Sequence, residues 1–365
     1  MRWRPIALFA VLIGVMLCLA GALFLVSHGL ESGKTGEAGD RPIDLSIWSA
    51  TDTVAMTALI EAFEDANPTI DIHYTEFNTS ELHAAVLAAK PDQAPDIVIS
   101  SAMDLQVELV NRGLALPITV SNETPEWARW RNELFGFTSE PVALVFNRAA
   151  FADRPLPETR SDLAGMIRDD PAFFNGRVGT YDIALSGVGY MFATQDAQRG
   201  YQASRLVESL GRARARTYCC TGDMGADVAN GTTVLAYNVI GSYALQSVEA
   251  DERIGILLLS DYALVMTRSA FVMASTAHPL AAEGFIDFLL SPAGQDVIAQ
   301  QSSLFPLVSA GAPQQAFFGE RFKGATSLLP IRLRPGLLTW LDQKKKERFL
   351  RDWYASIDVG DRSAP

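Results

Sequence analysis

The stretch IDLSIWSATDTVAMTALIEAFEDANPTIDI, residues 43–72, decides the fold class of this chain. Its first seven residues are rich in β-formers, and residues 54–63 repeat apolar side chains at helical spacing until Asn67-Pro68 ends the pattern. Residues 69–77 then alternate as a second strand should. Strand, helix and strand in this order are typical of a parallel β-α-β unit.

The same alternation continues beyond this stretch. Residues 81–89 are predicted to form a helix, residues 96–99 (DIVI) a buried strand and residues 104–111 a further helix. We therefore expect an α/β fold with a mainly parallel sheet, whose ligands bind where strands end and helices begin. Three loops rich in small hydroxyl residues occupy that position: 49–51, 77–80 and 100–103.

The rest of the chain mixes further strands and helices. The predicted strands are 141–147, 177–180, 232–240 and 263–274. The predicted helices are 195–210, 278–290, 292–301 and 335–357.

Length and charge bound the function. The chain has 365 residues, more than one hydrophobic core usually serves, so a two-lobed unit or two domains is expected. Beyond residue 30 it carries 28 basic and 42 acidic side chains, a net charge of −14. Such an acidic body repels phosphate backbones, which argues against nucleic-acid binding.

The N-terminus indicates export. Arg2 and Arg4 precede an uncharged apolar run, 6–26, which is long enough as a helix to cross a bilayer. Residues 1–30 are therefore predicted to be a signal peptide or an uncleaved membrane anchor, and 31–42 a flexible polar linker. The body should then lie in the periplasm, possibly anchored to the inner membrane.

Several blocks resemble a known family. They are LSIWSATDTVAMTALIEAFEDANPTIDI, APDIVISSAMDLQVELVNRGLA, EPVALVFNR, VLAYNVIGSYAL and HPLAAEGFIDFLLSPAGQDVIAQQSSLFPL. In this order they resemble bacterial extracellular solute-binding proteins, in the group that includes the ferric-iron-binding proteins of ABC importers. The resemblance implies a type II periplasmic-binding-protein fold, in which two α/β lobes joined by two crossing strands close on a ligand.

The resemblance also implies an organisation and a function. The crossings would lie near 139–142 and 263–271. Lobe 1 would comprise residues 43–140 and 262–302, and lobe 2 residues 141–261 and 303–365. A monomer would capture a small solute and deliver it to an ABC permease, without a cofactor. A membrane-tethered ligand sensor for a two-component signalling partner, such as a sensor kinase, is the alternative with the same fold.

Ferric iron is a further alternative, and the residues argue against it. Ferric relatives place an adjacent tyrosine pair where this chain has single tyrosines, Tyr237 and Tyr243, and they use a histidine after the first strand, where this chain has Ser49-Ala50-Thr51-Asp52. Hydroxyl and glycine loops at helix N-termini fit an organic anion better. We therefore expect a small polar, anionic ligand.

Candidate contacts follow from these positions. Hydroxyls at the predicted strand ends come first, with the residues at the position of the family's ligand loop. They are Ser49, Thr51, Ser100, Ser101, Asn238 and Ser242. For the serines, simple helix capping is the alternative.

A second set lies in the other half of the chain. Residues 186–190, with Ser186 and Gly187 at their start, could form an anion nest or a plain glycine-rich turn. Tyr181 and Tyr190 could supply a rim, or pack in the core. Glu140 could bind a cationic group, or make a salt bridge at the hinge.

Adjacent cysteines, Cys219 and Cys220, are the least usual feature. In an oxidising compartment they could form a vicinal disulfide that stiffens the loop near the cleft. A redox or soft-metal site and two reduced buried thiols are the alternatives. A thiol oxidoreductase would need this pair, but the usual two-residue spacer is absent. Because no G-x-S-x-G or H-E-x-x-H motif occurs either, we do not expect an enzyme.

Overall fold

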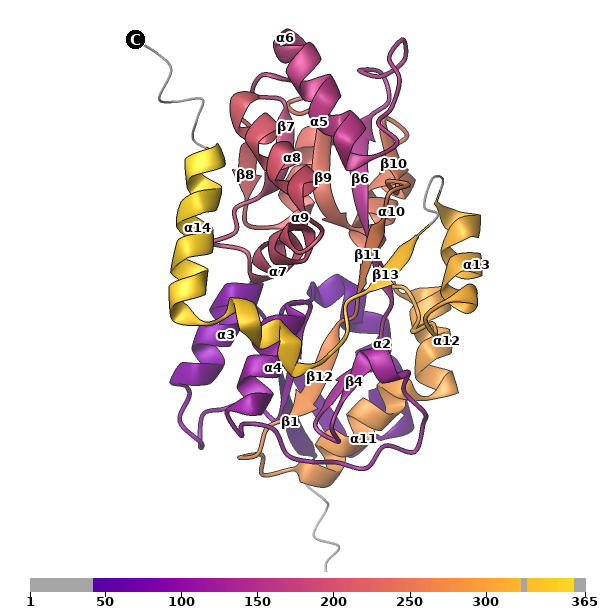
Figure 1. Ribbon diagram of the computed structural model, residues 1–365. Coiled ribbons are helices and arrows are strands. Elements are labelled where there is room, and N and C mark those ends of the chain that lie inside the picture. The colour runs from indigo at the N-terminus through magenta and orange to yellow at the C-terminus, as the bar shows by residue number, and fades with distance from the viewer. Residues whose placement is uncertain (1–41, 323–326, 358–365) are drawn as a thin grey trace, which may run out of the picture. The chain divides into compact units, whose positions relative to one another are not determined.

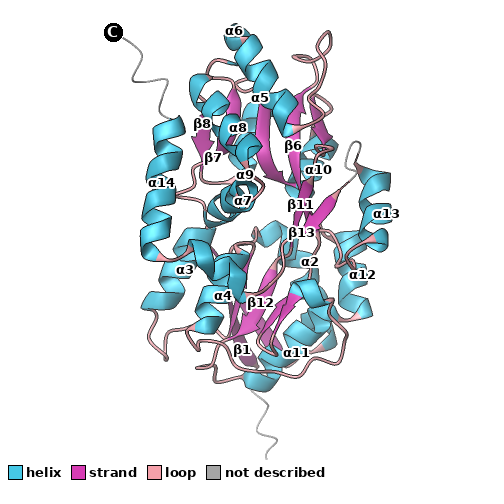
Figure 2. Cartoon of the chain, viewed as in Figure 1, coloured by secondary structure: helices cyan, strands magenta, loops and turns pink. Residues whose placement is uncertain are grey.

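The computed structural model describes residues 42–322 and 327–357, which fold from Ile43 onward as one compact unit (Figure 1). The unit contains two β-sheets with helices packed against them (Figure 2). We call the first sheet with its helices lobe 1, and the second lobe 2. The predicted signal peptide or anchor, and the linker as far as residue 41, lie outside the described residues.

The sheet of lobe 1 has the strand order β2-β1-β3-β12-β5-β4. Its strands are β1 (Ile43–Ser49), β2 (Ile70–Glu76), β3 (Ile97–Ser100), β4 (Arg129–Trp130), β5 (Leu134–Gly136) and β12 (Ser269–Val272). β1 pairs in parallel with β2 and β3, whereas β12 runs antiparallel to β3 and β5. The carboxyl ends of β1, β2 and β3 therefore lie at one edge of the sheet, as the β-α-β pattern predicts.

Helices of lobe 1 cover both faces of this sheet. They are α2 (Thr53–Ala66), α3 (Thr79–Ala88), α4 (Met103–Asn111), α11 (Pro279–Leu290) and α12 (Pro292–Gln301). α2 and α11 bury their apolar residues with those of β1 and β12, in a core that includes Leu45, Met56 and Phe285. Asn78 and Glu81 form a capping box that fixes the start of α3.

The sheet of lobe 2 has the order β13-β11-β6-β9-β7-β8, and β10 pairs with β6. Its strands are β6 (Glu140–Asn147), β7 (Val178–Tyr181), β8 (Arg216–Tyr218), β9 (Leu235–Ile240), β10 (Ile254–Leu257), β11 (Ala263–Met266) and β13 (Leu328–Pro330). β7 runs parallel to β8 and β9. The carboxyl ends of these three strands therefore share one edge.

Helices also follow the strands of lobe 2. They are α5 (Arg160–Asp169), α6 (Pro171–Phe174), α7 (Gly187–Ala197), α8 (Tyr201–Arg212), α9 (Thr221–Ala229) and α10 (Gly241–Ala250). The prediction of one helix over 195–210 is wrong, because the chain turns between α7 and α8 at Gly200. The φ angle of Gly200 is +96°, a conformation that ends a helix and that glycine adopts readily.

Two segments of chain cross between the sheets. β5 belongs to lobe 1 and β6 to lobe 2, so the chain crosses at 137–139; it crosses back between β11 and β12 at Thr267-Arg268. The prediction of one strand over 263–274 is therefore wrong, since these two residues leave the ladder. The segments are bonded to each other, with Phe137 N donating to Arg268 O at 3.0 Å and Arg268 N to Thr138 Oγ1 at 2.9 Å.

The C-terminal part of the chain returns to both lobes. After α13 (Ala312–Arg321), β13 joins lobe 2, the 3-10 helix η2 (Pro335–Trp340) packs on α4 of lobe 1, and α14 (Gln343–Ile357) packs on α8 of lobe 2 (Figure 1). The predicted single helix over 335–357 is thus two helices, divided at Leu341-Asp342. The segment spans the two lobes on the outside.

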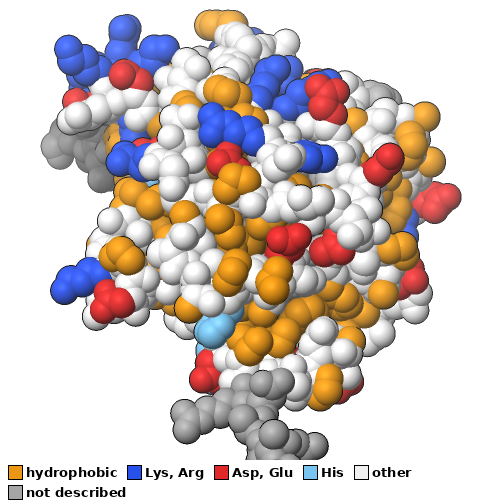
Figure 3. All heavy atoms as spheres, turned by 90° about the horizontal axis from the view of Figure 1, so that it is seen from below, with side chains coloured by type: hydrophobic (Ala, Val, Ile, Leu, Met, Phe, Trp, Pro, Cys, Tyr) orange, Lys and Arg blue, Asp and Glu red, His pale blue; other side chains and the backbone are white. Residues whose placement is uncertain are grey.

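The surface at the lobe 1 end shows mixed side chains. Acidic and basic residues are interspersed there, and apolar side chains are exposed between them (Figure 3). A continuous basic surface of the kind that nucleic acids need is absent from the described atoms of this face. None of the helices within 42–322 and 327–357 is long and apolar enough to cross a bilayer.

The crossing leaves no room for a side chain at Gly136. A Cβ atom there would collide with the buried side chain of Thr267, which is β-branched and stiff. We expect Gly136→Ala to destabilise the protein by about 2 kcal/mol or more, because strain of this kind in a packed interior is costly. Thermal denaturation would measure it.

Gly284→Ala on α11 is the matched control. A Cβ at Gly284 meets nothing within 4 Å, so the change should be neutral or stabilising, by up to about 1 kcal/mol. Equal melting temperatures for the two variants would contradict the close packing of the crossing segments.

Candidate functional site

Helix N-termini from both lobes meet between the sheets. α2, α3 and α4 follow the carboxyl ends of β1, β2 and β3, and α7, α9 and α10 follow those of β7, β8 and β9. The unpaired amides and the dipole of a helix N-terminus favour anions and oxygen acceptors. Both lobes therefore present groups that suit an anionic partner.

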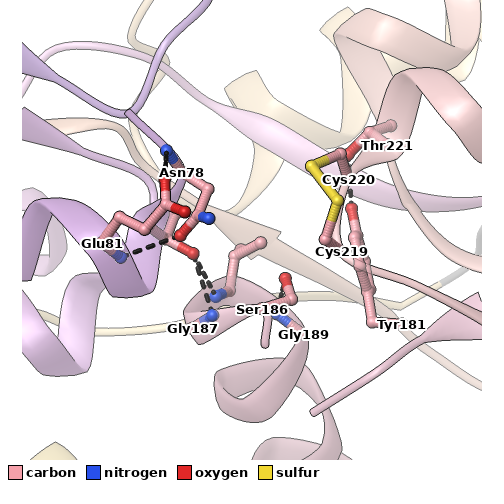
Figure 4. The surroundings of a disulfide bond; sticks show 11 residues. Asn78, Glu81, Tyr181, Ser186, Gly187, Gly189, Cys219, Cys220 and Thr221 are labelled. Carbon is pink, nitrogen blue, oxygen red and sulfur yellow. Dashed lines mark hydrogen bonds between the residues drawn. A yellow bond between two sulfur atoms is a disulfide. The ribbon is translucent and has the colours of Figure 1, made fainter. Parts of the chain in front are cut away.

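One contact shows such an amide site in use. The hydroxyl Oγ1 of Thr79, in lobe 1, accepts hydrogen bonds from the amides of Gly187 at 2.8 Å and Val188 at 3.3 Å, in lobe 2 (Figure 4). Ser186 caps the same helix, since its Oγ accepts from Gly189 N at 3.1 Å. The first amides of α7 thus bind an oxygen from the opposite lobe, in the region where the sequence predicts an anion nest.

A second direct contact joins the lobes at α2 and α10. Tyr243 OH donates to Asp52 Oδ1 at 3.0 Å, and the amide of Asp52 donates to the same hydroxyl at 3.3 Å. These contacts hold the described structure with its lobes touching. A solute that enters between the lobes must separate or replace them.

Arg268 is the central charge of this junction. It lies on the return crossing and is fully buried. Its Nη1 donates to Thr51 Oγ1 of lobe 1 at 2.9 Å, and its guanidinium stands 4.9 Å from the ring centre of Tyr243 of lobe 2. Nε of Arg268 lies 3.5 Å from Oε1 of Glu140, which is also fully buried and starts β6 after the first crossing. Both lobes and both crossings therefore contribute to one charged cluster.

The hydrogen bonding of this cluster is incomplete. Within the described residues, Nε and Nη2 of Arg268, both carboxyl oxygens of Glu140 and Oγ of Ser242 are buried without a hydrogen-bond partner of good geometry. A buried polar group left unpaired costs about 1–3 kcal/mol, and more if it is charged. Native proteins rarely tolerate such a group without a functional reason.

The environment acts on the charges in opposite ways. Burial raises the pKa of Glu140, and the neighbouring Arg268 and Ser242 only partly offset this. Burial also opposes the charge of Arg268, but Tyr243, Glu140 and Asp52 together raise its pKa above the ordinary arginine value. Arg268 is therefore a permanent cation, whereas the charge on Glu140 depends on what lies next to it.

The hydroxyls predicted on lobe 1 lie at the expected edge of the sheet. Thr51 reaches Arg268, as described above. Ser49 Oγ accepts from the amide of Thr51 at 3.1 Å, and Ser100 Oγ accepts from Ala102 N at 3.2 Å. All of them, and Ser101, are buried. Capping of the local backbone is thus what Ser49 and Ser100 do here, and it is compatible with a place beside a ligand.

Tyr181 and Tyr190 do not form a rim. Each is 2 % exposed. Tyr181 OH pairs with Thr221 Oγ1 at 2.5 Å, and Tyr190 OH donates to the carbonyl of Trp340 at 2.5 Å. The prediction of a stacking surface is therefore wrong, and the packing alternative holds. Residues far apart in sequence bury both rings, which a local pattern cannot show.

Asn238 is likewise bonded into lobe 2. Its Nδ2 donates to Asp196 Oδ2 at 2.9 Å, and its φ angle of +66° sets it apart from the rest of β9. It lines a cavity of about 170 Å³ between β7, α7, α8 and α14, together with Tyr181, Asp196 and Tyr237. The structure therefore brings Asn238 to this cavity and not to the cluster around Arg268.

Cys219 and Cys220 form a disulfide bond in the structure. Cys219 follows β8, and Cys220 is the N-cap residue of α9. Figure 4 shows the bond beside Tyr181 and Thr221, with the first turn of α7 and the capping residues of α3 in its surroundings. The disulfide thus belongs to the lobe 2 side of the junction.

Sequence reasoning missed Arg268, Thr79 and Asp52. A signal was present for the first, because Arg268 is the one charged residue in the apolar run 263–274. A charge in a predicted buried strand needs a partner or a function. Thr79 offered no such signal, since a hydroxyl at a helix start is ordinary capping.

The disulfide should contribute little to stability. A cross-link stabilises mainly by closing a loop in the unfolded chain, and neighbouring residues close the shortest loop there is. In a Cys18→Ser background, replacing both Cys219 and Cys220 by Ser should change the melting temperature by less than about 2 °C. Calorimetry would measure this. A loss of 5 °C or more would show that the bond is a structural staple instead.

A buried carboxyl at the junction sets a pH dependence. Asp104 lies in the first turn of α4, and its Oδ2 has no hydrogen-bond partner within the described residues. Burial raises its pKa to about 7, although the Leu105 amide, Lys346 and His83 oppose the shift. The stability that belongs to the protonated form is complete below the unfolded pKa, and it is lost as the pH rises towards 7.

Asp104→Asn should therefore stabilise the protein at pH 8, by roughly 1–3 kcal/mol, and flatten the fall in stability between pH 4 and 7. Melting curves across this range would test it. Glu108→Gln, one turn along α4, is the control of opposite sign, because His83 and Arg112 lower the pKa of Glu108 to about 2. An Asp104→Asn variant less stable than the parent at pH 8 would contradict the assignment.

Known proteins share this architecture. Residues 45–301 match the model of a family described as bacterial extracellular solute-binding protein. No curated protein sequence matches the chain significantly. A solved structure, the substrate-binding protein of an ABC transporter from Agrobacterium tumefaciens, is similar at 31% identity and a TM-score of 0.79, covering 89% of this chain and 96% of that one.

Two more distant structures share the fold. Fructose-6-phosphate-bound AfuA from Actinobacillus pleuropneumoniae has a TM-score of 0.69 at 14% identity, covering 87% of this chain and 99% of that one. Iron-bound HitA from Pseudomonas aeruginosa has a TM-score of 0.62 at 21% identity, covering 74% and 88%. The family match spans well over half of the chain, and the Agrobacterium likeness extends over most of it. The chain therefore belongs to the bacterial extracellular solute-binding proteins.

Proposed function

We propose that the protein captures a small polar, anionic organic solute between its lobes and delivers it to the permease of an ABC importer, in the periplasm. The single observation that carries this is the unsatisfied guanidinium of Arg268. A carboxylate or phosphate can accept two parallel hydrogen bonds from such a group. The ABC transporter role of the Agrobacterium protein supports the delivery step.

Closure of the lobes would couple binding to delivery. The two crossings are the proposed hinge, with residues 43–140 and 262–302 on one side and 141–261 and 303–365 on the other. Groups from both sides already surround Arg268, namely Thr51 and Tyr243. A solute held by both lobes favours the closed state by its differential affinity, which the permease can then distinguish from the open state.

Iron fits this junction less well. A ferric ion prefers hard, negatively charged oxygens. Here the central group is a cation, and Tyr237 is tied to Arg160 and Asp196 within lobe 2. In the described part of the chain, the clusters of acidic, histidine or cysteine residues that could hold a metal lie elsewhere, at Cys219, Cys220 and Asp223 and at Asp44, Asp71 and His73.

A thermal-shift screen on the full chain tests the proposal. The compounds are succinate, glutarate, glutamate, glycerol 3-phosphate, fructose 6-phosphate, O-phosphoethanolamine, putrescine and ferric citrate. A bound solute at a hundred times its dissociation constant stabilises by about 2.7 kcal/mol, so at least one anion should raise the melting temperature by several degrees. A shift with ferric citrate alone would contradict the proposal.

The paired variant Arg268→Gln with Glu140→Gln should abolish that shift. Both residues are changed together so that neither charge is left buried alone. The control removes an exposed pair on α8, Arg212→Gln with Glu208→Gln, whose side chains are 2.7 Å apart and far from the crossings in sequence. The control should keep the full shift. An unchanged shift in the Arg268 variant would place the solute elsewhere.

A further inference from the structure

The junction asks for hydrogen-bond partners of both signs. Nε and Nη2 of Arg268 need acceptors, while the two oxygens of Glu140 need donors. Oγ of Ser242, beside Glu140, can serve as either. An anion alone would satisfy the guanidinium, yet it would leave the carboxyl of Glu140 buried next to a second negative charge.

A hinge salt bridge does not account for these atoms. Arg268 and Glu140 meet only through the 3.5 Å contact between Nε and Oε1, without the paired hydrogen bonds of a bidentate ion pair. A pair that existed only to join the crossings would be expected to satisfy itself. As it stands, most of its hydrogen-bonding capacity points to a third partner.

A second buried arginine in the same chain shows what a structural role looks like. Nε of Arg160 donates to Tyr237 OH at 2.7 Å, and its Nη1 donates to Asp261 Oδ1 at 2.8 Å and to the carbonyl of Tyr262 at 2.7 Å. Its neighbour Asp196 accepts from the hydroxyls of Tyr237 and Tyr262. No nitrogen of Arg160 lacks a partner, whereas two nitrogens of Arg268 do.

The distance between the two groups limits the solute. Because the guanidinium and the carboxyl are 3.5 Å apart, an acidic and a basic group that pair with them must lie close together on one small molecule. A cation without an acid would meet Arg268 unpaired, and a bare anion would meet Glu140. Each would leave one full charge buried without compensation.

We propose that the solute is a small zwitterion, with its carboxylate or phosphate on Arg268 and its primary ammonium on Glu140. This inference rests on the proposed function and specifies the class of solute for the same site. The ammonium donates to the free oxygens of Glu140 and keeps that carboxyl ionised despite its burial. Discrimination then comes from Glu140, because a solute without the ammonium leaves its carboxyl unpaired.

Matched pairs of compounds test it on the full chain. Glutamate is compared with glutarate, and O-phosphoethanolamine with ethyl phosphate, so that within each pair the ammonium is the main difference. In at least one pair the member with the ammonium should bind about tenfold or more tightly, measured by calorimetric titration. Glu140→Gln should bring the two members of that pair within about threefold, and Glu208→Gln on α8 should leave the difference unchanged.

The outcomes separate this inference from the proposed function. If both members of each pair bind equally, or if only the members without ammonium bind, the zwitterion is excluded while an anion site at Arg268 stands. Should Glu140→Gln fold poorly, the parent protein alone still decides between these cases. If none of the four compounds binds and the wider screen gives no shift with any anion, both proposals fail.

Discussion

The buried charge of Arg268 is the constraint on which the junction of the two lobes depends. A guanidinium that is fully removed from water must be compensated, and the chain supplies Glu140 from one crossing, Thr51 from lobe 1 and Tyr243 from lobe 2. Compensation is incomplete, since two nitrogens of Arg268 and both oxygens of Glu140 stay unpaired within the described residues. The structure thus concentrates unsatisfied polar groups where both sheets and both crossings meet.

This arrangement links the fold to solute binding. The crossings are bonded to each other through Phe137, Thr138 and Arg268, so the charged cluster sits on the same segments about which the lobes would move. Direct contacts at Thr79–Gly187 and Asp52–Tyr243 hold the lobes together in the structure described. A solute that offers its own acceptors and donors can take over from these contacts, and binding and closure then become one event.

The sequence predicted the architecture well and the site in part. Periodicity located β1, α2, β2 and the hydroxyl loops, because strand and helix periods are local properties. It joined β11 to β12 across Thr267-Arg268, since a crossing is defined by sheet pairing that only the fold reveals. Tyr181, Tyr190 and Asn238 failed as ligand contacts for the same reason, as their partners Thr221, Trp340 and Asp196 come from distant segments. Arg268 could have been found, as a lone charge in an apolar strand.

A crystal structure of the full chain grown with glutamate or O-phosphoethanolamine tests the central claim most directly. The account predicts the acidic group within about 2.7–3.2 Å of Nε or Nη2 of Arg268, and the ammonium beside Glu140. A solute bound in the lobe 2 cavity lined by Asn238 and Asp196, or one held without Arg268, would contradict it.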